Sequence, residues 1–277
     1  MRLAELLEEA GAPAGVLNVV NGDKEAVDAI LDHPDIGAVS FVGSTPVAKH
    51  VYSRGSLAGK RVQALGGAKN HMVAMPDADL DKVVNSAKGA IFGQAGQICS
   101  AMSRVIAHKS VKNQLVDKLS NLANSLKVGH GSEDGTDLTP VISEEQLQKI
   151  ENYSRSGQQA GANAVAGGKR VDRKGYFFEA TVFDNVQPEM TIAQEEIFGP
   201  VLSVLEYSDE EEAVSIANNT EFGLAAGVFT NDVNKATSMA SQLNGGQVYV
   251  NSWFTGSVAT PFGGYKQSGY SREKGQE

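Results

Sequence analysis

The stretch Ile36-Gly37-Ala38-Val39-Ser40-Phe41-Val42-Gly43-Ser44-Thr45 contains the unit on which the fold of this chain is built. Its apolar run to Val42 predicts a buried strand, and the short polar turn after it predicts a helix from about Pro46 to Tyr52. A strand that leads at once into a helix is the repeating unit of parallel sheets. The stretch therefore indicates an α/β protein.

The same alternation extends outward on both sides of this stretch. Before it, the pattern predicts an amphipathic helix over Arg2–Ala10, a short buried strand over Val16–Val20 and a helix that begins after Asp23. After it, eight more strands are predicted, over Arg61–Leu65, Asn70–Met75, Arg104–His108, Ala162–Ala166, Phe177–Phe183, Val201–Tyr207, Leu224–Phe229 and Gln247–Asn251. Helices are predicted between them, over Pro76–Phe92, Val111–Leu126, Glu144–Gln159, Glu210–Asn218 and Val233–Leu243.

Length and composition describe an ordinary globular protein. The 277 residues are 41% hydrophobic and 21% charged, enough for one large or two ordinary domains. The net charge of -9 opposes the phosphate backbone, so nucleic acid is not an expected partner. No apolar run approaches the roughly 20 residues of a membrane helix, and a membrane association is not expected. A single cysteine fits a reducing compartment, and we expect a cytoplasmic protein.

The only cysteine lies in Phe92-Gly93-Gln94-Ala95-Gly96-Gln97-Ile98-Cys99-Ser100-Ala101. Glycines and small residues around a thiol allow a substrate to approach closely, but a lone Cys is commonly a buried small hydrophobe. None of the five histidines pairs with Cys99 at a metal-ligand spacing, so no metal site is expected. The residues of this stretch alone leave a nucleophile and a core residue open.

The two ends of the chain interrupt the pattern. The N-terminal part supplies only a thin sheet, whereas a stable open sheet usually has about four to six strands. The glycine-rich aromatic segment Pro261–Tyr270 lies only a few residues before the end. We therefore expect the chain to be a piece of a longer protein.

Four stretches in this order resemble the NAD(P)-dependent aldehyde dehydrogenase superfamily: Phe41–Ser44, Gly93–Cys99, Glu195–Pro200 and Pro261–Gly264. The resemblance implies a partial parallel-sheet nucleotide-binding domain over residues 1–63 and an α/β catalytic domain over residues 64–255. It also implies a truncated return segment toward the nucleotide domain over residues 256–277. The full-length parent would be a homo-oligomer.

The resemblance also assigns roles to individual residues. Cys99 matches the nucleophile that attacks a small-molecule aldehyde and forms a thioester, and its backbone N–H matches part of an oxyanion hole. Gly43 and Ser44 match the turn that meets the pyrophosphate of NAD or NADP at a helix N-terminus. The Rossmann fingerprint G-x-G-x-x-G is absent from the chain.

Four further positions match the nicotinamide end of the cofactor. Glu196 and Phe198 match the pair that holds the nicotinamide ribose. Leu65 and Gly66 match positions beside the nicotinamide ring. The residues that would distinguish NAD from NADP lie outside the stretches that carry the resemblance.

One position departs from the family pattern in a way that bears on the products. Ala64 stands where most members carry the glutamate that activates water, and an alanine cannot accept a proton. The run Gly66–His71 resembles methylmalonate-semialdehyde dehydrogenases, in which coenzyme A removes the acyl group. That branch usually has arginine before its cysteine, where this chain has Ile98. The acyl acceptor, water or coenzyme A, stays open.

Two other readings compete with aldehyde oxidation. The asparagine and lysine that the family places nearer its N-terminus are absent, which favours a catalytically incomplete fragment with no activity alone. A thiol hydrolase needs no cofactor, but it needs a base beside Cys99 that the sequence does not show.

Overall fold

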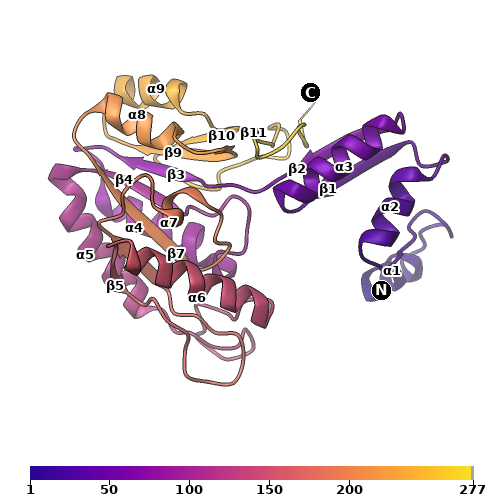
Figure 1. The fold of residues 1–277 in the computed structure, drawn as a ribbon, viewed down its shortest axis with the longest axis horizontal. Coiled ribbons are helices and arrows are strands. Elements are labelled where there is room, and N and C mark those ends of the chain that lie inside the picture. The colour runs from indigo at the N-terminus through magenta and orange to yellow at the C-terminus, as the bar shows by residue number, and fades with distance from the viewer. Residues whose placement is uncertain (276–277) are drawn as a thin grey trace.

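A computed structural model describes residues 1–275, so the last two residues of the predicted return segment, 276–277, lie outside the described part. Most of the chain surrounds a seven-stranded sheet in the order β10-β9-β3-β4-β7-β6-β5 (Figure 1). Neighbouring strands run parallel except β5 and β6, which are antiparallel. The strands are β3 (His71–Ala74), β4 (Arg104–His108), β5 (Asn163–Ala166), β6 (Thr181–Asp184), β7 (Val201–Tyr207), β9 (Ala225–Phe229) and β10 (Gln247–Val250).

Helices cover both faces of this sheet. Helices α8 and α9 lie on the upper side of the sheet in Figure 1, α4 and α5 pack together on its other face, and α6 packs against α7 and the edge strand β5. Strand β7 shows the result, because it is buried at every position except Glu206. Strands that are covered on both faces consist of nearly continuous apolar residues, and the sequence of β7 shows this pattern. The helices are α4 (Leu80–Ala87), η1 (Lys88–Phe92), η2 (Gly93–Gly96), α5 (Lys109–Ser125), α6 (Glu144–Gln159), α7 (Thr191–Gln194), α8 (Glu210–Asn218) and α9 (Val233–Gln242).

A smaller unit projects from one side of the large sheet (Figure 1). In it β1 (Ala38–Val42) pairs in parallel with β2 (Arg61–Leu65), and the connection between them is α3 (Thr45–Leu57). Two further helices precede them, α1 (Arg2–Glu9) and α2 (Lys24–Asp32). The strand–turn–helix unit predicted around Gly43 is therefore present.

The C-terminal segment links the two units. Strand β11 (Tyr265–Lys266) pairs antiparallel with β8 (Phe222–Gly223) of the larger unit. The chain then runs beside β2, where the N–H of Tyr270 donates to the carbonyl of Ala64 at 3.0 Å. The C-terminal segment thereby connects the end of β2 to the larger unit.

Three sequence expectations about elements were wrong. Val16–Val20 forms no strand, and Val16 and Val20 are 68% and 72% exposed, because no neighbouring strand in the described part pairs with them. The helix expected over Pro76–Phe92 begins at Leu80, and its last turn widens into the π-helical η1. The strand expected over Phe177–Phe183 begins only at Thr181.

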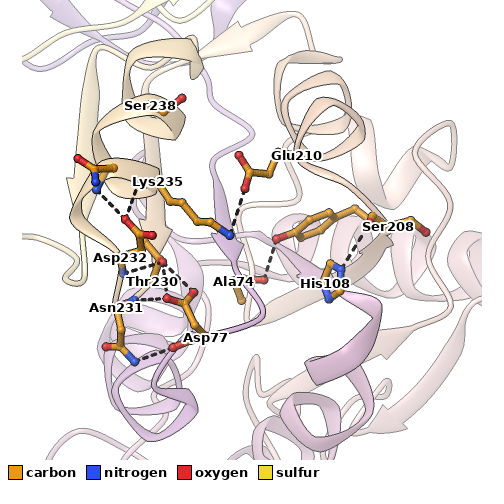
Figure 2. Close-up of polar contacts among 12 residues, drawn as sticks. Ala74, Asp77, His108, Ser208, Glu210, Thr230, Asn231, Asp232, Lys235 and Ser238 are labelled. Carbon is orange, nitrogen blue, oxygen red and sulfur yellow. Dashed lines mark hydrogen bonds and ion pairs between the residues drawn. The ribbon is translucent and has the colours of Figure 1, made fainter.

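Asp77 lies just before α4, a position that suggests a helix cap, but it does not cap this helix. Asp79 caps that helix, and its carboxylate accepts the N–H groups of residues 81 and 82 at 3.1 and 3.2 Å. Asp77 instead accepts from the Thr230 hydroxyl at 2.7 Å and from the Asn231 N–H at 2.9 Å (Figure 2). This contact joins the segments that follow β3 and β9, at the carboxyl ends of the strands. Cys99 lies at their amino ends.

Candidate active site

The loop that carries Cys99 has an unusual backbone. Gln94, Ala95 and Gly96 all have φ between 53° and 70°, the left-handed region that non-glycine residues rarely adopt. Only a glycine fits at position 96, because a Cβ there would stand 2.0 Å from the carbonyl oxygen of Gly199. The loop turns sharply against the Glu195–Pro200 segment and brings Cys99 to the amino end of β4.

Side-chain donors hold the carbonyl groups that follow the thiol. The buried amide of Asn70 donates to the carbonyls of Cys99 at 2.8 Å and Ala101 at 2.7 Å. The indole N–H of Trp253 donates to the carbonyl between them, that of Ser100, at 3.1 Å. Asn70 itself is fixed by β9, since its Oδ1 accepts the N–H of Ala225 at 2.9 Å. The peptide groups after Cys99 therefore have a set orientation.

The Cys99 thiol is half-buried, and burial raises its pKa above the ordinary value. The nearby carboxylate of Glu196 raises that pKa further, because a negative charge disfavours the thiolate. The backbone N–H groups of Ser100 and of Cys99 itself oppose this rise and lower the thiol pKa. Burial and the Glu196 charge outweigh them, and the pKa of the thiol stays above its ordinary value.

A cavity of about 420 Å³ opens in front of the thiol, between the two units. Most of the predicted site residues meet on its wall, although they come from segments far apart in the sequence. Leu65 is the exception, because its side chain is only 4% exposed and does not line the cavity. The lining residues are Val42, Gly43, Ser44, Gly66, Gln97, Ile98, Cys99, Gln146, Lys149, Glu196 and Phe198.

The first turn of α3 faces this cavity through Gly43 and Ser44. Ser44 is the N-cap residue, and its side chain makes no capping hydrogen bond within the described part. The free N–H groups at the start of a helix attract anions, so this end of the cavity suits a phosphate group. The neighbouring Leu65 contributes its carbonyl, which accepts the N–H of Gly43 at 3.1 Å.

Glu196 lies on the opposite wall, against the turn that follows β2. Its Oε1 accepts the N–H of Ala68 at 2.9 Å, and a Cβ on Gly67 would stand 2.8 Å from Oε2. Burial raises the pKa of the Glu196 carboxyl, while Lys149 and Lys69 oppose that rise. Within residues 1–275 this carboxylate is the only one on the cavity wall, and it can accept hydrogen bonds from hydroxyl groups.

Phe198 holds a strained backbone next to Glu196, with φ of 58°. The Gln146 side chain of α6 secures this conformation by donating to the carbonyls of Ile197 at 3.0 Å and Phe198 at 2.8 Å. Sequence reasoning did not assign a role to Gln146, and nothing in the pattern of α6 distinguishes it from other polar helix residues. Only the folded chain brings it to the cavity.

Asn70 and Trp253 were also missed. Asn70 lies within the Gly66–His71 run that carried the resemblance, so a signal existed, but a lone amide gives no indication of its partners. Trp253 is the only tryptophan in the chain, and it follows the segment where the regular pattern stops. Their contacts with the Cys99 loop join residues far apart in the sequence, and the periodicity of apolar residues cannot predict such contacts.

Other kinds of site are not found in the part of the chain that the structure describes. Over residues 1–275 there is no group of three or more side chains from His, Cys, Asp and Glu placed to hold a metal ion. In the same range no helix combines the length and the apolar composition that crossing a bilayer demands. The cavity beside Cys99 is the candidate active site of the described part.

The fold and the site define an α/β protein in which one thiol faces a cavity beside a parallel-sheet unit. The model of the aldehyde dehydrogenase family matches residues 1–277 of the chain. A malonate-semialdehyde dehydrogenase of Halalkalibacterium halodurans is 45% identical over 272 residues, which are 97% of this chain and 56% of that protein. The chain belongs to the aldehyde dehydrogenase family.

Solved structures agree in fold. Betaine aldehyde dehydrogenase of Staphylococcus aureus in complex with NAD+ superposes with a TM-score of 0.94 at 37% identity, over 100% of this chain and 56% of that one. A candidate methylmalonate-semialdehyde dehydrogenase of Sinorhizobium meliloti, complexed with NAD, gives 0.95 at 45% identity, over 99% and 57%. The chain thus spans just over half the length of these relatives. The predicted fold class and family are confirmed.

Proposed function

We propose that this chain carries the thiol half of an NAD(P)+-dependent aldehyde oxidation. The observation that carries the proposal is the single cavity where Cys99 meets Gly43, Ser44 and Glu196. A nucleophile, an anion-binding helix start and a hydroxyl-binding carboxylate are the groups that this reaction needs together. The NAD-bound structures of relatives support the choice of cofactor class.

The proposed reaction begins at the sulfur of Cys99. The thiolate attacks the aldehyde carbon, the C–S bond forms and the carbonyl oxygen becomes an oxyanion. The backbone N–H groups of Cys99 and Ser100 would stabilise this oxyanion, because the carbonyls of their peptide groups, those of Ile98 and Cys99, are held by other donors. A hydride then leaves the same carbon, and a thioester on Cys99 remains.

Nicotinamide, when bound, supplies the acceptor for that hydride. The residues that would hold the nucleotide fit the geometry of the cavity wall. The start of α3 at Gly43 and Ser44 would bind the pyrophosphate, and Glu196 would accept from the ribose hydroxyls beside Phe198. Gly66 lies on the wall and would present its backbone to the nicotinamide ring, since a Cβ there would stand 2.6 Å from the carbonyl oxygen of Gln267.

Coenzyme A is the second candidate for the acyl acceptor. Ala64 is completely buried beneath the C-terminal segment, and Glu196 is the only carboxylate that the described part of the chain places on the cavity wall. If Glu196 binds ribose, no carboxylate remains to activate water, whereas a thiol can displace the thioester without one. The apolar Ile98 beside the nucleophile, however, offers no positive charge to a substrate that carries its own carboxylate.

The experiment that tests the proposal compares the natural protein with Cys99→Ser. Formation of NADH or NADPH is followed with a panel of aldehydes, with and without coenzyme A, and the products are identified by mass. The chain and the whole product of its gene are both assayed. We expect Cys99→Ser to lower the rate by at least about a thousandfold, and retained turnover would remove Cys99 from the nucleophile role.

The products distinguish the remaining candidates. A free acid formed at the same rate without coenzyme A indicates water as the acceptor, and an acyl thioester indicates coenzyme A. A protein that binds neither nucleotide nor aldehyde indicates the catalytically incomplete alternative. Thioester hydrolysis without any nucleotide would indicate the thiol hydrolase.

A further inference from the structure

We propose that Asn70 is a positioning residue for the nucleophile, which acts through the peptide group that follows Cys99. The inference deepens the proposed function and rests on it. The starting observation is that Asn70 donates to the carbonyls of Cys99 and Ala101, while Trp253 donates to that of Ser100 between them.

A trans peptide group is planar, and its C=O and N–H point in opposite directions. When Asn70 holds the carbonyl of Cys99, the N–H of Ser100 must point the other way. This N–H is also the backbone group that most lowers the pKa of the Cys99 thiol. The amide of Asn70 thus holds one side of the peptide group and the N–H of Ser100 lies on the other, so fixing one side fixes the other.

The next two peptide groups are held in the same way at both ends. Trp253 holds the carbonyl of Ser100, and the N–H of the following residue donates to the carbonyl of Ile98 at 2.9 Å. Asn70 holds the carbonyl of Ala101, and the N–H of Met102 donates to the carbonyl of Ala90 at 2.9 Å. Because the Ile98 carbonyl is held by the N–H of Ala101, the N–H of Cys99 on the same peptide group is fixed in the opposite direction.

Asn70 is suited to this task by its own attachment. It is 3% exposed, and its Oδ1 accepts the N–H of Ala225 on β9. Its backbone carbonyl also accepts the N–H of Arg104 at 3.1 Å, at the start of β4. The amide oxygen of Asn70 is thus bonded to the rigid sheet, and its amide NH₂ group makes two donations to the thiol loop. A neutral amide supplies donors without adding a charge near the thiolate.

The test measures the reactivity of the thiol directly. Cys99 is the only cysteine, so iodoacetamide labelling of the folded chain reports on this residue alone and needs neither nucleotide nor aldehyde. Asn70→Ala removes both donations without changing charge. We expect labelling about tenfold slower at pH 7.5, a pH midpoint about one unit higher, and the same rate at high pH.

The direction of the change separates positioning from a purely structural role. Loss of structure exposes Cys99 and speeds labelling at every pH, whereas loss of the Ser100 N–H slows it only below the midpoint. Equal or faster labelling in folded Asn70→Ala would overturn the proposal. Folding is checked by circular dichroism and by comparison with labelling in urea.

A second variant keeps the proposal testable if Asn70→Ala does not fold. Trp253→Phe removes only the indole donor and keeps an aromatic ring against Tyr249. We expect labelling about threefold slower at pH 7.5, and no slowing would overturn the proposal. The matched controls are Tyr249→Phe beside the indole ring and Asn121→Ala at an exposed position of α5, and both should label at the natural rate.

Labelling also separates this inference from the proposed function. If labelling slows as expected but the protein oxidises no aldehyde, the positioning role stands and the proposed reaction fails. If the protein oxidises aldehydes and both variants label normally, the reaction stands and the positioning role fails. In an active protein, Asn70→Ala should lower kcat and leave KM unchanged.

Discussion

The backbones of Gly96 and Gly199 lie in direct contact, and a Cβ on residue 96 would stand 2.0 Å from the carbonyl oxygen of Gly199. Residue 96 also has φ of 70°. The nucleophile loop and the loop that carries Glu196 and Phe198 are therefore pressed together through two glycines. The distance between the sulfur and the carboxylate depends on this contact.

Gly96→Ala is the first prediction. Both the close contact and the left-handed backbone oppose the added methyl group, so we expect a loss of about 2 kcal/mol or more in the free energy of unfolding. Urea unfolding at pH 7.5 measures it. Gly93→Ala is the matched control in the same loop, because its Cβ would meet no atom within 4 Å and its φ is -54°. Equal effects of the two variants would contradict the contact argument.

Glu196→Gln tests the electrostatic link between the two loops. The Glu196 charge raises the pKa of the Cys99 thiol, so removing that charge should lower the pKa and increase the thiolate fraction below it. We expect iodoacetamide labelling about threefold faster at pH 7.5, with the pH midpoint moved downward. Glu195→Gln, whose carboxylate accepts from the Tyr153 hydroxyl, is the control. An unchanged midpoint in Glu196→Gln would rule out the link.

Ala64→Glu tests whether a missing base limits hydrolysis of the thioester. If water is the acceptor, a carboxylate that reaches the cavity should speed hydrolysis by about tenfold or more relative to Ala64→Gln. The two variants have the same shape and differ in the ability to accept a proton. Both should lower stability, since Ala64 is 0% exposed. Rapid-quench measurement of the acyl-enzyme gives the rate, and equal rates would count against the missing-base argument.

Lys69→Met addresses the pH dependence of stability. Burial, and next the charge of Arg104, lower the pKa of the Lys69 ammonium to about 7, and its Nζ has no hydrogen-bond partner within residues 1–275. Above pH 7 the unfolded chain binds a proton that the folded chain has released. Stability should therefore rise as the pH rises from 7 to 8.5, by at most about 2 kcal/mol for one proton.

In Lys69→Met this rise should disappear, and the variant should be more stable than the natural chain at pH 7. Urea midpoints at pH 7.0, 7.75 and 8.5 measure both effects. The pKa of His71 lies well below 6.5, so its contribution falls below this range. Lys174→Met, at an exposed position, should keep the rise. A rise that persists in Lys69→Met would show that Lys69 is not its source.

Local sequence patterns predicted the regular elements well where the signal was strong. The helix Glu144–Gln159 and the strand Val201–Tyr207 have the predicted bounds, because a helical spacing of apolar residues in the first and a continuous apolar run in the second reflect burial directly. The pattern failed for Val16–Val20, because an apolar run predicts a strand only if a neighbouring strand pairs with it. Pairing is a property of the assembled sheet.

The sequence by itself determined the family, the strand–helix order and the candidates for the site, because motifs and periodicity are written in neighbouring residues. The tertiary structure alone decided how these candidates act on one another. The contacts of Cys99 with Asn70, of Ser100 with Trp253 and of Gly96 with Gly199 join residues from different strands and loops. Such contacts depend on how the strands pair and how the loops pack against one another, and the periodicity of neighbouring residues gives no information about either.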